Sequence, residues 1–333
     1  MAAAQHAHVI VGPAGGHRLV VAGVTALERT LWGLGKRGVL TAVVAAEPFA
    51  LRGDLPILVG WVPAGTPPEA DVEVVRGDVV EGIHVHDTAS CRAAELVLLE
   101  GLGKSYQGIT DALFNRHISR RITDVLATTR VTPNQVTVVS ILVGLLAAGL
   151  LLERSYWAVA LGGLAIELQS ILDSCDGELA RLRFQYSRIG QWLDNVGDDL
   201  VDNAFIACAG LAVGGPWAWV GCGAALVRLA SAVTMYLEVY QTTGTGDVYR
   251  FRIWFDRGKQ TADEVFKNDP RSPFTWLRNV GRRDTYTFAW MLLCLVGAPL
   301  GVVVWGGIMA AILGVNMVIH VWLRVQGRLR PLS

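Results

Sequence analysis

Four carboxylates lie close together in a part of the chain that is otherwise apolar. Asp173 and Asp176 are three residues apart, and Asp194 and Asp198 are four residues apart. On a helix each pair shares a face, because residues at these spacings lie one turn apart. Ionised carboxylates are costly at membrane depth, so a shared cation is needed to stabilise them. The spacing therefore predicts a pocket between two helices for a divalent metal ion, which prefers hard oxygen ligands.

Small residues and one arginine accompany the carboxylates. Gly177 and Ala180 fall on the same helical stripe as Asp173, and Gly190 precedes the second pair. Small residues allow a nucleotide to approach the helix backbone, and they equally allow two membrane helices to pack closely. The planar guanidinium of Arg181 suits a phosphate group, although an arginine here also fits the positive charge at the cytoplasmic end of a span. A phosphate-containing ligand and a structural role both remain open for these residues.

The whole run, D-x-x-D-G-x-x-A-R-x8-G-x3-D-x3-D, resembles the signature of the CDP-alcohol phosphotransferase (CDP-alcohol phosphatidyltransferase) family. The sequence Thr132-Pro133-Asn134-x-x-Thr137 is similar to the one that opens the first membrane span in this family. The resemblance covers residues 104–325. It implies an integral membrane enzyme that moves a substituted phosphate group from a CDP-alcohol to an acceptor alcohol and releases CMP.

Within this resemblance the motif residues take specific roles. Four carboxylates can hold two divalent cations, Mg²⁺ or Mn²⁺. Asp198 is the candidate general base on the acceptor hydroxyl, and it is also a candidate fourth metal ligand. The candidate metal ligands are Asp173, Asp176, Asp194 and Asp198. The candidate nucleotide-binding residues are Asn134, Thr137, Gly177, Ala180, Arg181 and Gly190.

The acceptor site is predicted next to these carboxylates. Asp202 continues the stripe of Asp198 by one turn, so it either lines the acceptor pocket or belongs to a buried hydrogen-bond network. A phosphate group on the acceptor needs cations, whereas each nearby arginine also fits contact with lipid headgroups. The candidate acceptor-binding residues are Asp202, Arg116, Arg228, Arg282 and Arg283, with Arg120 as a further cation at the cytoplasmic rim.

Two further stretches narrow the expected substrates. Residues 115–120 and 280–284 are similar to stretches in inositol-phosphate enzymes that make di-myo-inositol phosphate phosphate. In that subgroup a cytidylyltransferase is fused to the membrane transferase. By analogy, the donor is CDP-inositol or CDP-diacylglycerol and the acceptor is inositol phosphate. The family resemblance also implies a homodimer.

Residues 1–103 differ in pattern from the rest. Short apolar runs at 8–12, 40–45, 56–62 and 72–75 alternate with helical periodicity at 24–36 and 90–102, which predicts a small α/β domain. A Gly-rich loop with Arg18 and the helix after it resemble the start of a nucleotidyltransferase. The proline-lysine step that would bind the triphosphate is missing. We therefore expect a degenerate domain that folds but does not catalyse.

The helices that carry the motif are predicted to span a membrane. An amphipathic stretch at 109–126 precedes them and is expected to lie on the membrane surface. The connections rich in Lys and Arg place both termini and the acidic cluster on the cytoplasmic side of the inner membrane. The six predicted spans are 135–152, 156–176, 190–213, 216–240, 285–300 and 301–324. The predicted divisions are the degenerate domain at 1–103, a surface helix and linker at 104–131, the six-span transferase domain at 132–326 and a cytoplasmic tail at 327–333.

Composition agrees with this prediction and excludes one class of partner. Apolar residues make up 52% of the chain and the mean hydropathy is +0.40, as is typical of membrane proteins. The formal net charge of zero argues against a nucleic-acid partner. The five cysteines are scattered without metal-ligand spacing, and no cleavable signal peptide is evident. Two alternatives remain: a cation or proton transporter that uses the aspartates, and a non-catalytic nucleotide-binding scaffold.

Overall fold

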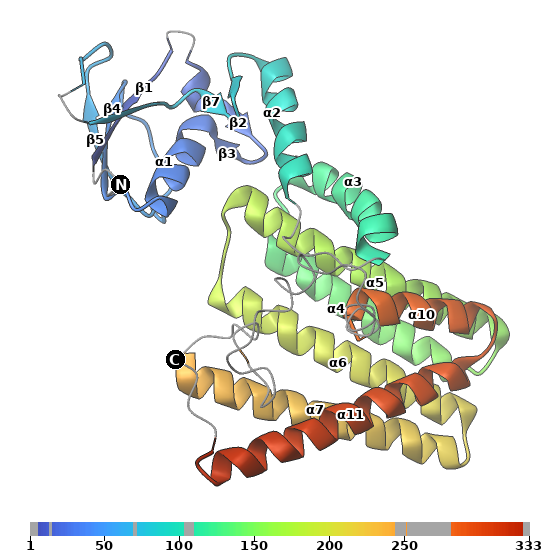
Figure 1. Cartoon of the computed structure of the whole chain (residues 1–333). Coiled ribbons are helices and arrows are strands. Elements are labelled where there is room, and N and C mark those ends of the chain that lie inside the picture. Colours follow the sequence, from blue (N-terminus) through green and yellow to red (C-terminus); the bar gives the residue numbers. More distant parts are fainter. Residues whose placement is uncertain are drawn as a thin grey trace. The chain divides into compact units, whose positions relative to one another are not determined.

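The computed structural model describes residues 6–12, 15–68, 72–102, 110–243, 251 and 281–328. The chain forms two compact units. The first consists of Met1–Leu102 with Ala127–Thr129, and the second of Gly103–Leu126 with Arg130–Ser333. Figure 1 shows strands in the first unit and a bundle of long helices in the second.

A parallel sheet forms the centre of the first unit. Val9 pairs with Val44 on one side and with Val75 on the other, so the middle of the sheet consists of β-branched residues that pack well on a pleated surface. Parallel neighbours need a crossover connection, and α1 (Ala26–Lys36) lies in the one between β1 and β4. The sheet order is β5-β4-β1-β6, with β1 at His6–Ile10, β4 at Thr41–Ala45, β5 at Leu58–Val62 and β6 at Glu73–Arg76.

Helix α1 has both a start signal and an apolar face. The Thr25 side chain accepts a hydrogen bond from the backbone of Glu28, and the Glu28 carboxylate accepts one from the Thr25 backbone at 3.0 Å. Leu27, Leu31 and Leu34 are buried in one apolar core with residues of the sheet. The other elements are α2 (Thr88–Gly101) and two ribbons, β2 (Val20–Val21) with β3 (Val24–Thr25) and β7 (Val79–Val80) with β8 (Ile83–His84).

The predicted α/β region with a parallel sheet is therefore confirmed. The four predicted apolar runs lie on β1, β4, β5 and β6, and the two helical segments lie on α1 and α2. The two short ribbons were not predicted, because two-residue strands are too short to show a period of two.

The second unit is a bundle of helices. α4 packs on α5 and α6, α7 packs on α6 and α11, and α10 packs on α5. Thr132 starts α4 with a capping box, in which its backbone N–H donates to Gln135 Oε1 at 2.9 Å. The helices are α4 (Pro133–Leu151), α5 (Tyr156–Arg183), α6 (Arg188–Val213), α7 (Pro216–Thr243), α10 (Arg283–Leu295) and α11 (Pro299–Val325).

Small residues and stacked rings bring these helices together. A Cβ on Gly210 of α6 would lie 2.9 Å from Cα of Gly221 of α7, so only glycine permits this close approach. Phe205 of α6 and Trp290 of α10 are both buried, and their rings stack with centroids 5.7 Å apart. The two rings belong to a continuous apolar cluster shared by α4, α5, α6, α7, α10 and α11.

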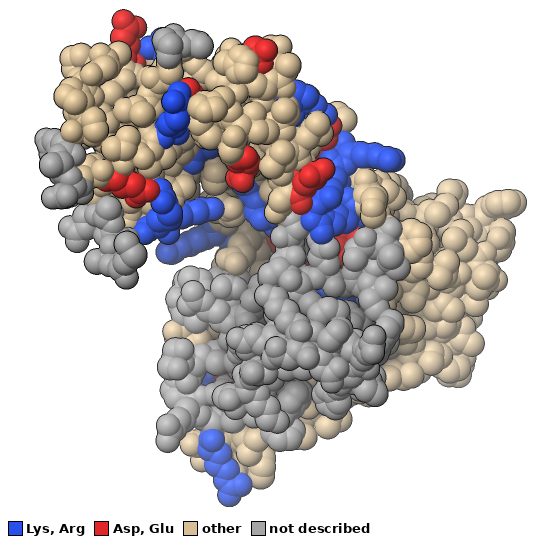
Figure 2. Space-filling view, turned by 45° about the horizontal axis from the view of Figure 1, so that its top comes forward, with Lys and Arg blue, Asp and Glu red and all other residues tan. Residues whose placement is uncertain are grey.

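Four of the described helices are long and apolar enough to cross a membrane: α4, α5, α7 and α11. Large apolar side chains are exposed on them, among them Leu146, Leu226 and Val318. Such a surface suits lipid rather than water. In Figure 2 the visible described part of the helical unit is mostly tan, whereas charged side chains are frequent on the first unit.

The other two predicted spans are not confirmed as such. α10 has 13 residues and rises only about 20 Å, whereas the bilayer core is roughly 30 Å thick. α6 is long enough at 26 residues, but Asp194, Asp198, Asp199 and Asp202 lower its mean hydropathy. The confirmed part of the prediction is a helical region with four candidate spans.

The predicted surface helix corresponds to one π-helical turn at Asp111–Asn115 followed by α3 (Arg116–Ala127). Its first predicted residue, Ile109, lies outside the described residues, as does most of the basic stretch between α7 and α10. In the described part of this helix, Ser119 and Thr123 are fully buried while Arg121 and Val125 are exposed. One face of α3 is therefore packed against the bundle.

Candidate active site

The turn between α5 and α6 sets the positions of the carboxylates. α5 ends where Phe184 adopts a left-handed backbone with φ of 54°. α6 starts after Ser187, whose side chain caps the new helix. Both helices pack on α4, and they run antiparallel to each other, so both extend from this turn on the same side. Asp173 and Asp176, in the second half of α5, therefore come close to Asp194 in the first half of α6.

Three of the carboxylates converge. One oxygen from each of Asp173, Asp176 and Asp194 lies within 4.8 Å of the others. Asp176 is 6% exposed and accepts a hydrogen bond from the hydroxyl of Thr137. Oδ1 of Asp173 is buried and has no hydrogen-bond partner among the described residues. A trio of hard oxygen donors with an unsatisfied buried oxygen fits a divalent cation such as Mg²⁺ or Mn²⁺.

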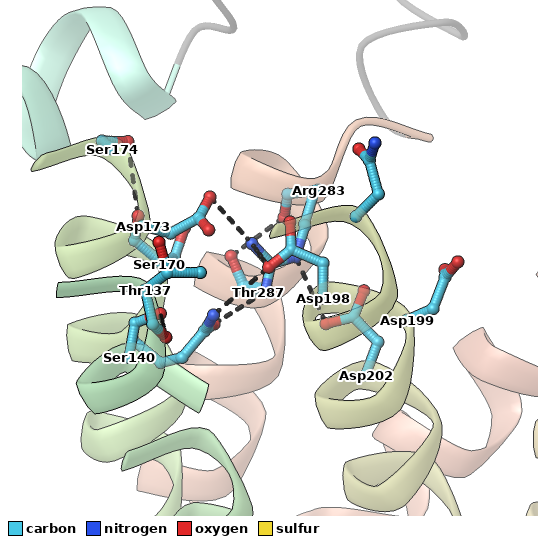
Figure 3. A network of polar contacts seen from close by, with 12 residues as sticks. Thr137, Ser140, Ser170, Asp173, Ser174, Asp198, Asp199, Asp202, Arg283 and Thr287 are labelled. Carbon is cyan, nitrogen blue, oxygen red and sulfur yellow. Dashed lines mark hydrogen bonds and ion pairs between the residues drawn. The ribbon is translucent and has the colours of Figure 1, made fainter. Parts of the chain in front are cut away.

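Asp198, the fourth predicted ligand, faces an arginine instead of the trio. Its Oδ1 lies 2.9 Å from Nη1 of Arg283, and the same nitrogen lies 3.1 Å from Oδ2 of Asp173. Gln169 accepts a hydrogen bond from Nη2 of Arg283 at 2.7 Å and donates one to Asp198 at 3.5 Å. Figure 3 shows Arg283 entering from α10 between α5 and α6. Arg283 thus connects the metal-ligand candidates with the candidate base.

Asp202 lies one turn beyond Asp198 in a closed network. It is 2% exposed, and Oδ2 accepts a hydrogen bond from the hydroxyl of Tyr286. Nε of Arg283 lies 3.4 Å from Oδ1, and Nη2 of Arg228 lies 3.6 Å from Oδ2. Arg228 also donates to Oδ1 of Asn203 at 3.1 Å. These contacts show that Asp202 belongs to a buried hydrogen-bond network.

A cavity of about 450 Å³ opens beside the trio, with Asp176 and Asp194 in its wall. A Cβ on Gly190 would lie 2.6 Å from Oδ1 of Asn134. The glycine therefore permits the contact between α4 and α6 while it also lines the cavity. The predicted nucleotide-binding residues all line this same cavity: Asn134, Thr137, Gly177, Ala180, Arg181 and Gly190.

The remaining predicted acceptor residues have other partners or positions. Arg282 forms an ion pair with Asp284 at 3.1 Å. Arg116 lies on α3, where burial and the neighbouring Arg120 lower the pKa of its guanidinium. Neither Arg116 nor Arg282 lines the cavity. The structure thus groups Asp202, Arg228 and Arg283 and leaves Arg116 and Arg282 outside that group.

Sequence reasoning missed the residue that docks α3 on the bundle. Both oxygens of Glu178 accept hydrogen bonds, one from Ser119 at 3.0 Å and one from Thr123 at 2.7 Å. Glu178 is buried and lies between two motif positions. The sequence contained a signal for Glu178, because a further carboxylate in an apolar helix needs a partner as much as the aspartates do.

Two polar residues around the aspartates were missed as well. Gln169 and Tyr286 lie in apolar surroundings of the sequence, where a buried amide or hydroxyl needs a hydrogen-bond partner. Asp199 points away from Arg283 in Figure 3 and accepts a hydrogen bond from the hydroxyl of Tyr236 on α7. Only the fold shows which carboxylate each of these groups contacts.

Comparison with known families matches residues 130–322 to the CDP-alcohol phosphatidyltransferase family. Among curated proteins, the chain is 32% identical over 205 residues to the bifunctional IPC transferase and DIPP synthase of Thermococcus kodakarensis, covering 61% of this chain and 41% of that protein. It is 32% identical over 151 residues to the protein of the same name from Aquifex aeolicus, covering 45% and 33%.

A shorter curated protein matches as well. The archaetidylinositol phosphate synthase of Pyrococcus horikoshii is 35% identical over 99 residues, which cover 30% of this chain and 50% of that protein. The matches span half or less of the length of each of these relatives. The predicted resemblance to this family and to its inositol-phosphate subgroup is confirmed.

Proposed function

The chain belongs to the CDP-alcohol phosphatidyltransferase family, and we propose that it transfers a substituted phosphate group from a CDP-alcohol to an acceptor alcohol and releases CMP. One observation carries this proposal. The carboxylates of Asp173, Asp176 and Asp194 converge within 4.8 Å at the wall of a cavity that all six nucleotide candidates line. A transporter needs carboxylates, but it has no use for Gly177, Ala180 and Arg181 at these places.

Asp173, Asp176 and Asp194 are the residues that would hold a divalent cation, Mg²⁺ or Mn²⁺, with Asp198 as the further ligand for a second ion. When bound, such cations neutralise phosphoryl oxygens and make CMP a better leaving group. The residues support this role in two ways. The hydroxyl of Thr137 fixes the orientation of Asp176, and the buried Oδ1 of Asp173 has a lone pair with no other described partner.

The cavity is the proposed place of the nucleotide. Small residues line part of the cavity: Gly177, Ala180 and Gly190. A larger side chain at any of these positions would fill the space beside the carboxylates. Arg181 is half-buried in this wall, and its planar guanidinium can bind a phosphate oxygen. Asn134 lines the same cavity and can donate and accept hydrogen bonds there.

Asp198 is the proposed general base. It accepts the proton of the acceptor hydroxyl, the oxygen attacks the phosphorus, and the bond between phosphorus and the CMP oxygen breaks. Its side chain is 23% exposed, so a hydroxyl can reach it. The amide of Gln169 and the guanidinium of Arg283 hold its carboxylate in place.

Inositol phosphate is the proposed acceptor, with CDP-inositol or CDP-diacylglycerol as donor. The names of the relatives support an inositol-containing substrate or product. Arg283 forms an ion pair with Asp198, and Arg228 forms one with Asp202. These residues form the proposed acceptor side of the site. Arg116 and Arg282 are proposed for its cytoplasmic rim.

We also propose the membrane arrangement. Six helices, including the charged α6 and the short α10, lie within the bilayer, both termini and the acidic centre face the cytoplasm of the inner membrane, and two chains form a homodimer. The ends of α5 and α11 and the starts of α6 and α10 carry arginines such as Arg181, Arg188, Arg283 and Arg324, as the positive-inside rule requires of a cytoplasmic end.

The first unit is proposed to be a degenerate nucleotidyltransferase domain at 1–103 that folds without catalysing. Residues 104–131 then form the surface helix and linker, 132–326 the transferase domain, and 327–333 a tail. The parallel sheet and the glycines after β1 support a nucleotidyltransferase ancestry. The missing lysine argues against triphosphate chemistry.

The test is CMP release by the purified protein in detergent with Mg²⁺, CDP-inositol or CDP-diacylglycerol, and inositol phosphate. We expect CMP and a new phosphodiester in equal amounts, and loss of both in EDTA. Full activity in chelator would contradict the metal-dependent mechanism. Absence of CMP with a panel of CDP-alcohols and acceptors would contradict the transferase and favour a transporter or a nucleotide-binding scaffold.

A further inference from the structure

Arg283 contacts two groups of carboxylates at once. Its Nη1 lies 3.1 Å from Oδ2 of Asp173, which belongs to the metal-ligand trio, and 2.9 Å from Oδ1 of Asp198, the proposed base. Figure 3 shows this guanidinium between the two carboxylates. Nη1 of Arg283 therefore contacts an oxygen of Asp173 that a metal ion would use as a ligand. The same nitrogen contacts an oxygen of Asp198 that would accept the proton of the acceptor hydroxyl.

Arg283 also contacts Asp202, and this carboxylate has other partners besides Arg283. Asp202 receives a hydrogen bond from Tyr286 and lies 3.6 Å from the guanidinium of Arg228. It therefore keeps a cation and a hydroxyl donor when Arg283 moves. The side chain of Arg283 is 19% exposed, so it is not fully enclosed by the bundle. The site allows Arg283 to change partners without leaving a buried carboxylate unpaired.

The guanidinium of Arg283 disfavours the binding of a metal cation at the trio. The positive charge of Arg283 repels a divalent ion at the trio and occupies an oxygen of Asp173, and both effects lower metal affinity. An anion that binds Arg283 removes this opposition. Binding free energies are reciprocal, so metal binding must strengthen anion binding by the same factor.

We propose that Arg283 couples the acceptor to the acidic centre. In the substrate-free enzyme it pairs with Asp173 and Asp198. When an acceptor with a phosphate group binds, the guanidinium pairs with that phosphate, which frees Asp173 for the divalent cation and Asp198 for the acceptor hydroxyl. This inference rests on the proposed function. It predicts that a phosphorylated alcohol is a better acceptor than the bare alcohol, since only the phosphate releases the base.

The test measures Mn²⁺ affinity by titration calorimetry on the full-length protein in detergent, without donor. The titration is repeated with saturating inositol phosphate and with unphosphorylated inositol. In the wild type we expect inositol phosphate to tighten Mn²⁺ binding by about fivefold or more, and inositol to leave it unchanged. The signal is an affinity, so it does not depend on turnover.

Three variants separate the coupling from general effects. In Arg283→Gln, Mn²⁺ should bind at least about fivefold more tightly without any acceptor, and inositol phosphate should no longer change its affinity. Arg283→Lys keeps the charge but cannot span two carboxylates, so the coupling should fall to below about half of its wild-type free energy. The matched control is Arg121→Gln, which removes one exposed arginine from α3 and should retain the full coupling.

The outcomes distinguish this inference from the proposed function. If the wild type binds Mn²⁺ and releases CMP but inositol phosphate leaves Mn²⁺ affinity unchanged, the coupling is wrong and the transferase stands. Unaltered coupling in both Arg283 variants overturns the inference as well, because another group then transmits it. If the wild type neither binds Mn²⁺ nor releases CMP, the proposed function fails and the inference fails with it.

Discussion

The two units of the molecule place their carboxylates in opposite ways. In the first unit Asp78 pairs with Arg76 at 3.0 Å, and Glu73 pairs with Arg37 at 2.8 Å. In the second unit one guanidinium, that of Arg283, contacts three carboxylates on α5 and α6. The first unit thus satisfies its acids one by one, whereas the second concentrates them around few cations.

This difference distinguishes carboxylates that are neutralised within the fold from carboxylates that need a ligand for neutralisation. Burial raises the pKa of Asp78, but the hydrogen bond and the charge of Arg76 outweigh it, so the pKa of Asp78 is lowered overall. That carboxylate has a complete set of partners within the chain. Around Arg283 the acids outnumber the bases, and buried like charges persist only when an external cation or a substrate compensates them. This imbalance supports the proposed position of the ligands.

The largest effect is expected from neutralising the trio. Asp176→Asn keeps the shape but removes one ligand charge, so CMP release should fall by at least about a thousandfold and CDP-alcohol binding should be lost with it. Activity and nucleotide binding are measured on the same preparation. Asp78→Asn is the matched control in the first unit and should leave CMP release within about twofold. Equal losses in both variants would erase the contrast between the units.

A smaller effect is expected from the proposed base. Asp198→Asn should lower the rate of transfer by roughly a hundredfold or more, because a positioned general base contributes on this scale. CDP-alcohol binding should largely survive, since Asp198 lies outside the carboxylate trio. The dissociation constant of the CDP-alcohol and the rate are compared with those of Asp176→Asn. If nucleotide binding disappears as completely as in Asp176→Asn, then Asp198 is chiefly a ligand and the base lies elsewhere.

A moderate effect on the use of the acceptor is expected from the hydrogen bond between Tyr286 and Asp202. Tyr286→Phe removes the hydroxyl that donates to Asp202, and a hydrogen bond to a charged group is typically worth about 2 kcal/mol. Asp202 then draws Arg283 towards itself, so we expect kcat/KM for the acceptor to fall by about tenfold while KM for the donor stays unchanged. A change confined to the donor would place Asp202 on the nucleotide side.

No catalytic effect is expected from the first unit. Purified protein with CTP and inositol phosphate should release no pyrophosphate, because the lysine that would bind the triphosphate is absent. A coupled pyrophosphate assay checks this, with the wild type and Arg18→Gln side by side. Pyrophosphate release that depends on Arg18 would make the protein bifunctional, and both units would then carry chemistry.

Much of the fold could be predicted because the signals are local. The apolar runs of the first unit have the length and flanks of strands, and Thr132 with Pro133 is a helix start that needs no tertiary context. The count of spans was harder to predict. α10 begins beside Arg283 and ends after 13 residues, so its length is set by packing on α5 rather than by the hydrophobic thickness of a bilayer.

The sequence by itself determined the reaction class through the resemblance of its aspartate motif to the family signature, and the helical spacing predicted which carboxylates share a face. It also determined the wall of the cavity, since small residues at turn spacing must lie beside those carboxylates. Only the tertiary structure showed which aspartates converge and which contact Arg283. The position of Arg283 depends on how α10 packs against α5, more than a hundred residues from Asp173 in the sequence. No helical period can encode that contact, through which one guanidinium joins Asp173 of the trio to Asp198 and Asp202.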